Sequence, residues 1–268
     1  MLKEGKMTAE IDAKYVPRVK VENGAWKIDA EGMYYKDLNC LLRSLVCGEG
    51  AEKIEIRNVC GQRYIGTDLD AEVEIDLYGT PGNDMGAFMS GPRITVQGNA
   101  QDGCGNTMND GKIVVHGQAG DLTGHSMRGG QIFVRDDVGY RVGIHMKEYK
   151  RKVPDIVIGG AAGDFLAEYM AGGVVLVLGL TLGECEKCKA RFVGTGMHGG
   201  VIYERGDILE VGVGTKLVKV GKRDMQVIER LAKEYCEHFG ADYEVIMNAK
   251  FHKIVPVSKR PYGKLYSN

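Results

Sequence analysis

A 19-residue spacing constrains the fold of this chain more than any other feature. Apolar triplets of the form Ile-x-Val or Ile-x-Leu begin at Ile75, Ile94, Ile113, Ile132, Ile156 and Val175, so the steps are 19, 19, 19, 24 and 19 residues. Glycines follow the same step at Gly86, Gly105, Gly124 and Gly143, as do methionines at Met89, Met108, Met127 and Met146. Self-similarity at a fixed period of this length indicates a solenoid.

The chemistry of the repeat selects the kind of solenoid. Apolar residues alternate with period two in each triplet, which is typical of a strand with a half-buried face. At roughly 3.3 Å per residue, 19 residues trace about 60 Å, enough for one circuit with sharp corners. The 39 glycines in 268 residues are about twice the average share, and glycine adopts the positive φ that sharp corners need. We therefore predict an all-β solenoid, a single-stranded right-handed parallel β-helix with short flanking α-helices at both ends.

Composition narrows the class of protein. The net charge of -1 is spread over mixed signs, so no basic surface indicates nucleic acid or an anionic membrane. A signal peptide and an 18-residue apolar run are both missing from the sequence, which predicts a cytoplasmic protein without a membrane span. The seven irregularly spaced cysteines then favour reduced thiols.

The repeat divides the chain into three parts. Residues 1–53 are predicted to form an extended segment and a capping helix over Lys36–Cys47, ended by Gly48, with Cys40 and Cys47 packed inside. Residues 54–206 form the β-helix, beginning with a degenerate first coil. Residues 207–268 hold a second helix over Asp224–Gly240, which caps or flanks the solenoid, and an irregular extended tail.

Two polar segments are candidate binding surfaces. The first coil gathers hydrogen-bonding residues: Arg57, Asn58, Cys60, Gln62 and Arg63. They either contact an anion or a partner or close the polar corner of that coil. The insertion Lys147–Asp155 is basic, and insertions in solenoids form surface loops that often lie on a binding face. Solvation alone also explains a short run of charge.

No catalytic, cofactor-binding or metal-binding residue can be assigned. Cys185 and Cys188 form a Cys-x-x-Cys pair, but zinc needs four ligands, and Cys104 or His198 could complete the set only if the fold brings them close. Cys236 and His238 form a weaker pair.

Three other patterns are explained by the repeat. The segment Gly194–Gly199 matches G-x-G-x-x-G, but the strand-like residues after it do not fit a phosphate loop. The methionine column is predicted to be an internal stack. The residues His116, His125, His145 and His198 occupy three different repeat positions, so they build no shared ligand set.

The rows that begin at Gly98, Gly117 and Ala162 resemble the GXGXG domain, the β-helical C-terminal domain of the glutamate synthase large subunit. A related pattern occurs in one of the subunits of formylmethanofuran dehydrogenase. The segments Asn58–Gly66 and Arg260–Tyr266 look like the free-standing archaeal type, in which the large subunit is split into separate polypeptides. The glycine column of the family carries over to Gly86, Gly105, Gly124 and Gly143. Ala167 departs from it, so we expect that corner to differ.

The resemblance implies a non-catalytic subunit in glutamate biosynthesis and nitrogen metabolism. Its expected partners are an amidotransferase (glutaminase) subunit, which releases ammonia, and an FMN-dependent synthase subunit, which holds FMN and iron–sulfur clusters. Two alternatives stay open: a scaffold in another complex, of the formylmethanofuran dehydrogenase or N-methylglutamate synthase type, or a β-helical enzyme acting on carbohydrate or acyl substrates. A homo-oligomer through the open coil ends is also compatible with the sequence.

Overall fold

The computed structural model describes residues 16–183, 190–208 and 210–258. Their strands form one sheet in the order β1-β2-β3-β4-β5-β6-β7-β8-β9-β10-β12-β11. The strands are β1 (Val19–Glu22), β2 (Ala25–Asp29), β3 (Lys53–Cys60), β4 (Glu74–Thr80), β5 (Arg93–Gln97), β6 (Lys112–Val115), β7 (Gln131–Val134), β8 (Asp155–Ile158), β9 (Ala171–Val177), β10 (Gly199–Arg205), β11 (Thr215–Val218) and β12 (Phe251–Pro256). The helices are α1 (Tyr35–Arg43), α2 (Lys222–Phe239) and α3 (Tyr243–Met247).

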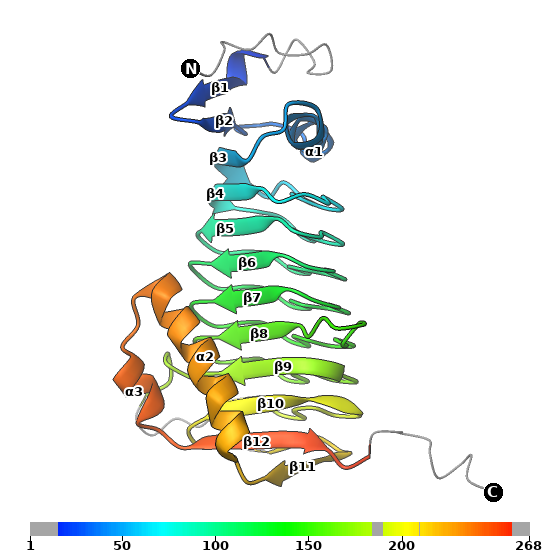
Figure 1. Cartoon of the computed structure of the whole chain (residues 1–268), viewed down its shortest axis with the longest axis vertical. Helices are drawn as coiled ribbons and strands as arrows, with labels where there is room; N and C mark the ends of the chain where they lie inside the picture. Colours follow the sequence, from blue (N-terminus) through cyan, green and yellow to red (C-terminus); the bar gives the residue numbers. More distant parts are fainter. Residues whose placement is uncertain (1–15, 184–189, 209, 259–268) are drawn as a thin grey trace, which may run out of the picture.

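Each strand from β2 to β9 pairs in parallel with the next one along the chain, and the strands stack as a column in Figure 1. The triplet residues lie directly over one another: Ile75 pairs with Ile94, and the register continues through Ile113, Ile132, Ile156, Val175 and Ile202. These side chains are buried in one core, together with Met89, Met108, Met127, Met146, Met170 and Met197. The predicted parallel β-solenoid and its internal methionine stack are therefore confirmed.

The corner opposite the strands explains the glycine column. Left-handed backbone recurs at alternate residues there, as at Gly103, Gly105 and Thr107, with φ of 70°, 69° and 53°. Because of this alternation, the N–H groups of these left-handed residues point in turn toward the next coil and toward the preceding coil. The N–H of Gly105 donates to the Met85 carbonyl of the preceding coil (2.8 Å), and that of Thr107 donates to the His125 carbonyl of the next coil (2.7 Å).

The middle residue of each alternation faces the core. A Cβ on Gly105 would lie 2.5 Å from Ile132 Cδ1, so a larger residue would collide with the core. Ala167 occupies this column with φ 55° and is fully buried, so its corner keeps the conformation of the others, and the expected difference is wrong.

The two ends of the solenoid are covered differently. At the N-terminal end, β1 pairs antiparallel with β2, and α1 buries Leu38, Leu41 and Leu42 in the core. At the C-terminal end, β12 pairs antiparallel with β10 and β11 with β12. The prediction of an irregular tail is therefore wrong for Phe251–Pro256; Arg260–Tyr266 lies outside the described residues.

Two details of the first helix differ from the prediction. The helix does not end before Gly48, because a π-helical turn continues through Ser44–Gly48, and Gly50 is the residue with left-handed φ. Cys40 and Cys47 are exposed rather than packed, since the leucines alone form the buried face.

The second helix is predicted correctly in sequence, and of its two predicted placements, capping or flanking, the structure shows the second, because α2 lies along the side of the solenoid. α2 ends at Gly240, whose φ is 68°, and runs across the strands from β12 toward β7 in Figure 1. Its buried residues Ile228, Leu231 and Tyr235 join a second core with Phe133, Val157 and other residues of the outer sheet face. This helix is therefore a side cover of the sheet.

Candidate functional site

The outward position of the sheet changes character along the solenoid. In register, the central outward residues are Lys27, Glu55, Asp76 and Thr95 in β2–β5, and then Val114, Phe133, Val157, Leu176 and Tyr203 in β6–β10. The second set is buried, and most of it lies in the core shared with α2. Triplets that are apolar at every position are typical of strands covered on both faces. This signal, visible in Ile132-Phe133-Val134, marks the strands that α2 covers, and the sequence interpretation above missed it.

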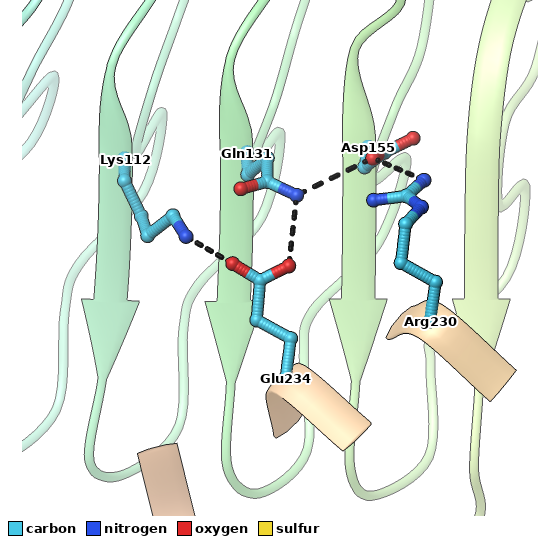
Figure 2. Close-up of polar contacts among 5 residues, drawn as sticks. All are labelled: Lys112, Gln131, Asp155, Arg230 and Glu234. Carbon is cyan, nitrogen blue, oxygen red and sulfur yellow. Dashed lines mark hydrogen bonds and ion pairs between the residues drawn. The ribbon is translucent and has the colours of Figure 1, made fainter. Parts of the chain in front are cut away.

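A polar network fixes α2 beside this apolar contact. Figure 2 shows Lys112, Gln131 and Asp155 on three adjacent strands facing Glu234 and Arg230 of α2. Lys112 forms an ion pair with Glu234, and Gln131 donates to Glu234 Oε2 at 3.1 Å and to Asp155 Oδ2 at 3.4 Å. Arg230 donates to Asp155 Oδ2 at 3.0 Å. The three contacts to α2 join residues 75 to 122 positions apart and set where along the sheet the helix lies.

The pKa values of the two carboxylates in the network are shifted in opposite directions. Burial raises the pKa of Asp155 above its ordinary value, although Arg230 and the Gln131 amide favour the ionised form. Burial also opposes ionisation of Glu234, but the hydrogen bond and the charge of Lys112 outweigh it and hold the pKa of Glu234 below its ordinary value. The described atoms offer Asp155 Oδ1 no hydrogen-bond partner, which is consistent with its reluctance to ionise.

Asp155→Asn and Glu234→Gln are expected to change the pH dependence of unfolding in opposite senses. A raised folded-state pKa means that the native state holds the Asp155 proton to higher pH than the unfolded chain, so wild type loses stability relative to Asp155→Asn as pH rises. The lowered pKa of Glu234 gives stability that wild type loses relative to Glu234→Gln as pH falls. Urea unfolding from about pH 7 down to about pH 3 measures both slopes, because the Asp155 slope lies above the ordinary carboxyl pKa of about 4 and the Glu234 slope lies below it. Parallel slopes for the two variants would contradict the network.

The outer corner of the solenoid carries a second unusual feature. The residues two positions before and two positions after the inward glycine are also left-handed but point outward. Many of them are large: Tyr64, Phe88, Leu122, Phe165, Tyr169 and Phe192, with φ between 54° and 62°. A left-handed conformation costs a non-glycine residue about 1–2 kcal/mol. Gly103 and Gly196 occupy the same positions in other coils without that cost. The corner therefore keeps exposed side chains where glycine would relieve strain.

Five outward left-handed residues form two stacks that together we call the aromatic ridge: Arg141, Phe165 and Phe192 in one, and His145 and Tyr169 in the other. Phe165 and Phe192 stack with ring centroids 4.9 Å apart, and His145 and Tyr169 stack at 5.5 Å. The Arg141 guanidinium lies 5.1 Å from the Phe165 ring centroid. The side chains of Tyr169 and Phe192 remain 47% and 38% exposed.

The basic insertion begins two residues after His145. Lys152 pairs with Asp110 at 2.6 Å, which holds the end of the insertion against the coil. Within the described part of the chain, no ion pair joins a carboxylate to Lys147, Lys150 or Arg151, all of which are exposed. The ridge carboxylates, in contrast, are already paired: Glu168 with Arg141 and Asp164 with Arg191. The excess charge of this surface is positive.

Most of the polar residues of the first coil close its corner, which was one of the two predicted roles for them. Gln62 is buried, accepts from the Cys60 N–H at 2.7 Å and donates to the Ala30 carbonyl at 2.9 Å. Asn58 donates to Asp29 Oδ1 at 2.9 Å, and Arg57 lies over the Tyr78 ring. Arg63 remains exposed.

The predicted ligand candidates are not brought together. Within the described ranges, no group of three or more His, Cys, Asp or Glu side chains is placed to hold a metal ion. Cys104 is buried, which raises the pKa of its thiol to about 12, and Cys185 and Cys188 lie outside the described residues.

The remaining histidine and glycine patterns belong to the coil and its helix. His125 lies near His145 (ring centroids 6.0 Å apart), whereas His116 contacts Phe239 and His238 contacts Phe133. The G-x-G-x-x-G segment ends at the start of strand β10, so it is not a phosphate loop.

Comparison with known protein families matches residues 52–257 to the family described as GXGXG motif. This range contains β3 to β10 and reaches β12, the strand that closes the C-terminal end. The chain belongs to the GXGXG family. A relative from Methanocaldococcus jannaschii, described as uncharacterized protein MJ1350, is 49% identical over 249 residues, which cover 90% of this chain and 95% of the relative.

Membership of the GXGXG family gives the corner alternation a sequence signature. The segment Gly103-Cys-Gly105-Asn-Thr107 places glycine, glycine and threonine at its three left-handed positions. Only the middle position faces the core in this chain, so it stays small while the outer two vary. No helix in the described ranges has the length and apolar character of a membrane span.

Proposed function

We propose that this GXGXG protein is a non-catalytic structural subunit of a glutamate synthase-like oxidoreductase. In this proposal it bridges an amidotransferase (glutaminase) subunit and an FMN/iron–sulfur synthase subunit, and the flavin and the clusters are bound by the synthase subunit. The observation that carries the proposal is the family match, which spans the solenoid from β3 to its closing strand β12. The match covers most of the chain, and the resemblance to glutamate synthase supports a joining role, because the similar domain there lies between the two catalytic domains.

The shape of the molecule supports a bridging role. Nine parallel strands at about 4.8 Å spacing form a rod of roughly 40 Å. A rod of stacked coils keeps a fixed length, because every coil is hydrogen-bonded to the coil on each side. Such an element can hold two enzymes at a constant separation while using its own buried residues for packing.

Reconstitution tests the proposed function. We expect this chain to co-elute with the amidotransferase and synthase subunits encoded in the same genome, and the ternary complex to form glutamate from glutamine and 2-oxoglutarate. Omitting this chain should remove the glutamine-dependent reaction and leave glutaminase activity in the amidotransferase alone. The purified chain should show no turnover with either substrate. Turnover by the isolated chain, or no complex with either subunit, would contradict the proposal.

A further inference from the structure

We propose that the aromatic ridge together with the basic insertion forms a docking surface for an acidic patch on an enzyme subunit of the complex. This inference rests on the proposed function for the identity of the partner. It adds which face of the solenoid that partner occupies and which side chains it contacts.

The backbone conformation gives the first reason. Phe165, Tyr169 and Phe192 keep φ of 62°, 54° and 60°, although glycine stands at the equivalent position in other coils. Their outward side chains are not part of the solenoid core. Strained residues of this kind concentrate at functional sites, where another interaction compensates for the strain. A contact with a partner would be such an interaction.

The composition of the surface gives the second reason. Aromatic residues and arginine are enriched at protein–protein interfaces, and the ridge contains both in preformed stacks. Stacking fixes the rings before binding, so little side-chain entropy remains to be lost in a complex. In the insertion, Tyr149 is exposed, and the Lys150 ammonium lies 5.2 Å from its ring centroid.

Charge identifies the chemistry of the partner. Lys147, Lys150 and Arg151 are exposed in the insertion, and the nearby acids Asp110, Asp164 and Glu168 are paired within the chain. Glu148, which accepts from the Gly173 N–H at 3.4 Å, offsets only one of the three positive charges. Carboxylates on a protein partner would neutralise these three cations. The whole chain has a net charge of -1, so the positive charge is a local property of this surface rather than a general affinity for polyanions.

Affinity measurements with the full chain and each separate enzyme subunit test this surface. Lys150→Glu with Arg151→Glu should weaken binding of one subunit about tenfold or more and reduce the salt dependence of its affinity. The matched control is Lys222→Glu with Arg223→Glu, two exposed cations on α2. We expect the control to change the affinity less than twofold.

Glycine substitutions separate docking from folding. Phe192→Gly removes the ring but relieves the strained φ, so the melting temperature should stay near that of wild type while affinity falls about tenfold. Tyr64→Gly is the matched control, because Tyr64 lies in the same column with φ 61° and is 39% exposed, against 38% for Phe192, but belongs to the first coil. Tyr64→Gly should bind as wild type does.

The outcomes distinguish this inference from the proposed function. If wild type binds a subunit and the ridge and insertion variants bind it equally well, the docking surface is elsewhere and the inference is wrong. If wild type binds neither subunit, the proposed function fails and the inference fails with it. If sedimentation shows wild type self-associating and the ridge variants monomeric, the surface contacts a second copy, which also overturns the inference.

Discussion

Gly124→Ala is expected to lower the free energy of unfolding by about 2–5 kcal/mol. The substitution places a Cβ 2.3 Å from Ile156 Cδ1 inside the core, and overpacking of this kind costs about 1–3 kcal/mol. It also forces alanine to adopt a φ of 71°, which costs about 1–2 kcal/mol more. Urea unfolding measures the loss of stability, and the melting temperature should fall by roughly 5–15 °C.

Two further variants divide this cost into its causes. Gly206→Ala has the same kind of backbone strain, with φ 84°, but apart from its chain neighbours no atom of the described residues lies within 4 Å of the added Cβ, so it should lose only the backbone share of about 1–2 kcal/mol. Adding Ile156→Val to Gly124→Ala removes the colliding Cδ1 atom, so the double variant should be more stable than the sum of the single variants predicts. If Gly124→Ala lowers the free energy of unfolding no more than Gly206→Ala does, the added methyl group does not overpack the core, which would contradict this explanation.

Phe133→Ala is expected to cost about 3–5 kcal/mol and to loosen α2. Phe133 points outward from the solenoid but is fully buried, because α2 covers it and the His238 ring lies 5.0 Å away. Removing the ring leaves a cavity between the helix and the sheet. Hydrogen exchange should accelerate in α2 and much less in β3–β5, which lie outside this contact.

Thr95→Ala is the matched control, since Thr95 occupies the same outward column two coils earlier and is covered by no helix of the described residues. A substitution there should change stability by no more than about 0.5 kcal/mol. Equal costs at Thr95 and Phe133 would contradict the assignment of α2 to the outer face of β7.

The sequence alone determined the solenoid, because its stabilising contacts repeat with the period of the chain. Ile94 packs against Ile113 for the same reason that Ile113 packs against Ile132, so one interaction appears many times in the sequence. The inward glycines and methionines follow the same argument. The α2 helix was also predictable from its own spacing and its terminal Gly240.

Tertiary structure decided where the non-repeating parts lie. The contact between Lys112 and Glu234 joins residues 122 positions apart, and no periodicity relates them. The placement of α2 along the sheet, the return of β12 beside β10 and the exposure of Cys40 depend on such single contacts. The aromatic ridge also depends on how the coils stack. Its left-handed residues point outward only when their N–H groups donate alternately to the preceding and the next coil. Contacts that recur leave a pattern in the sequence, whereas contacts made once are visible only after the chain has folded.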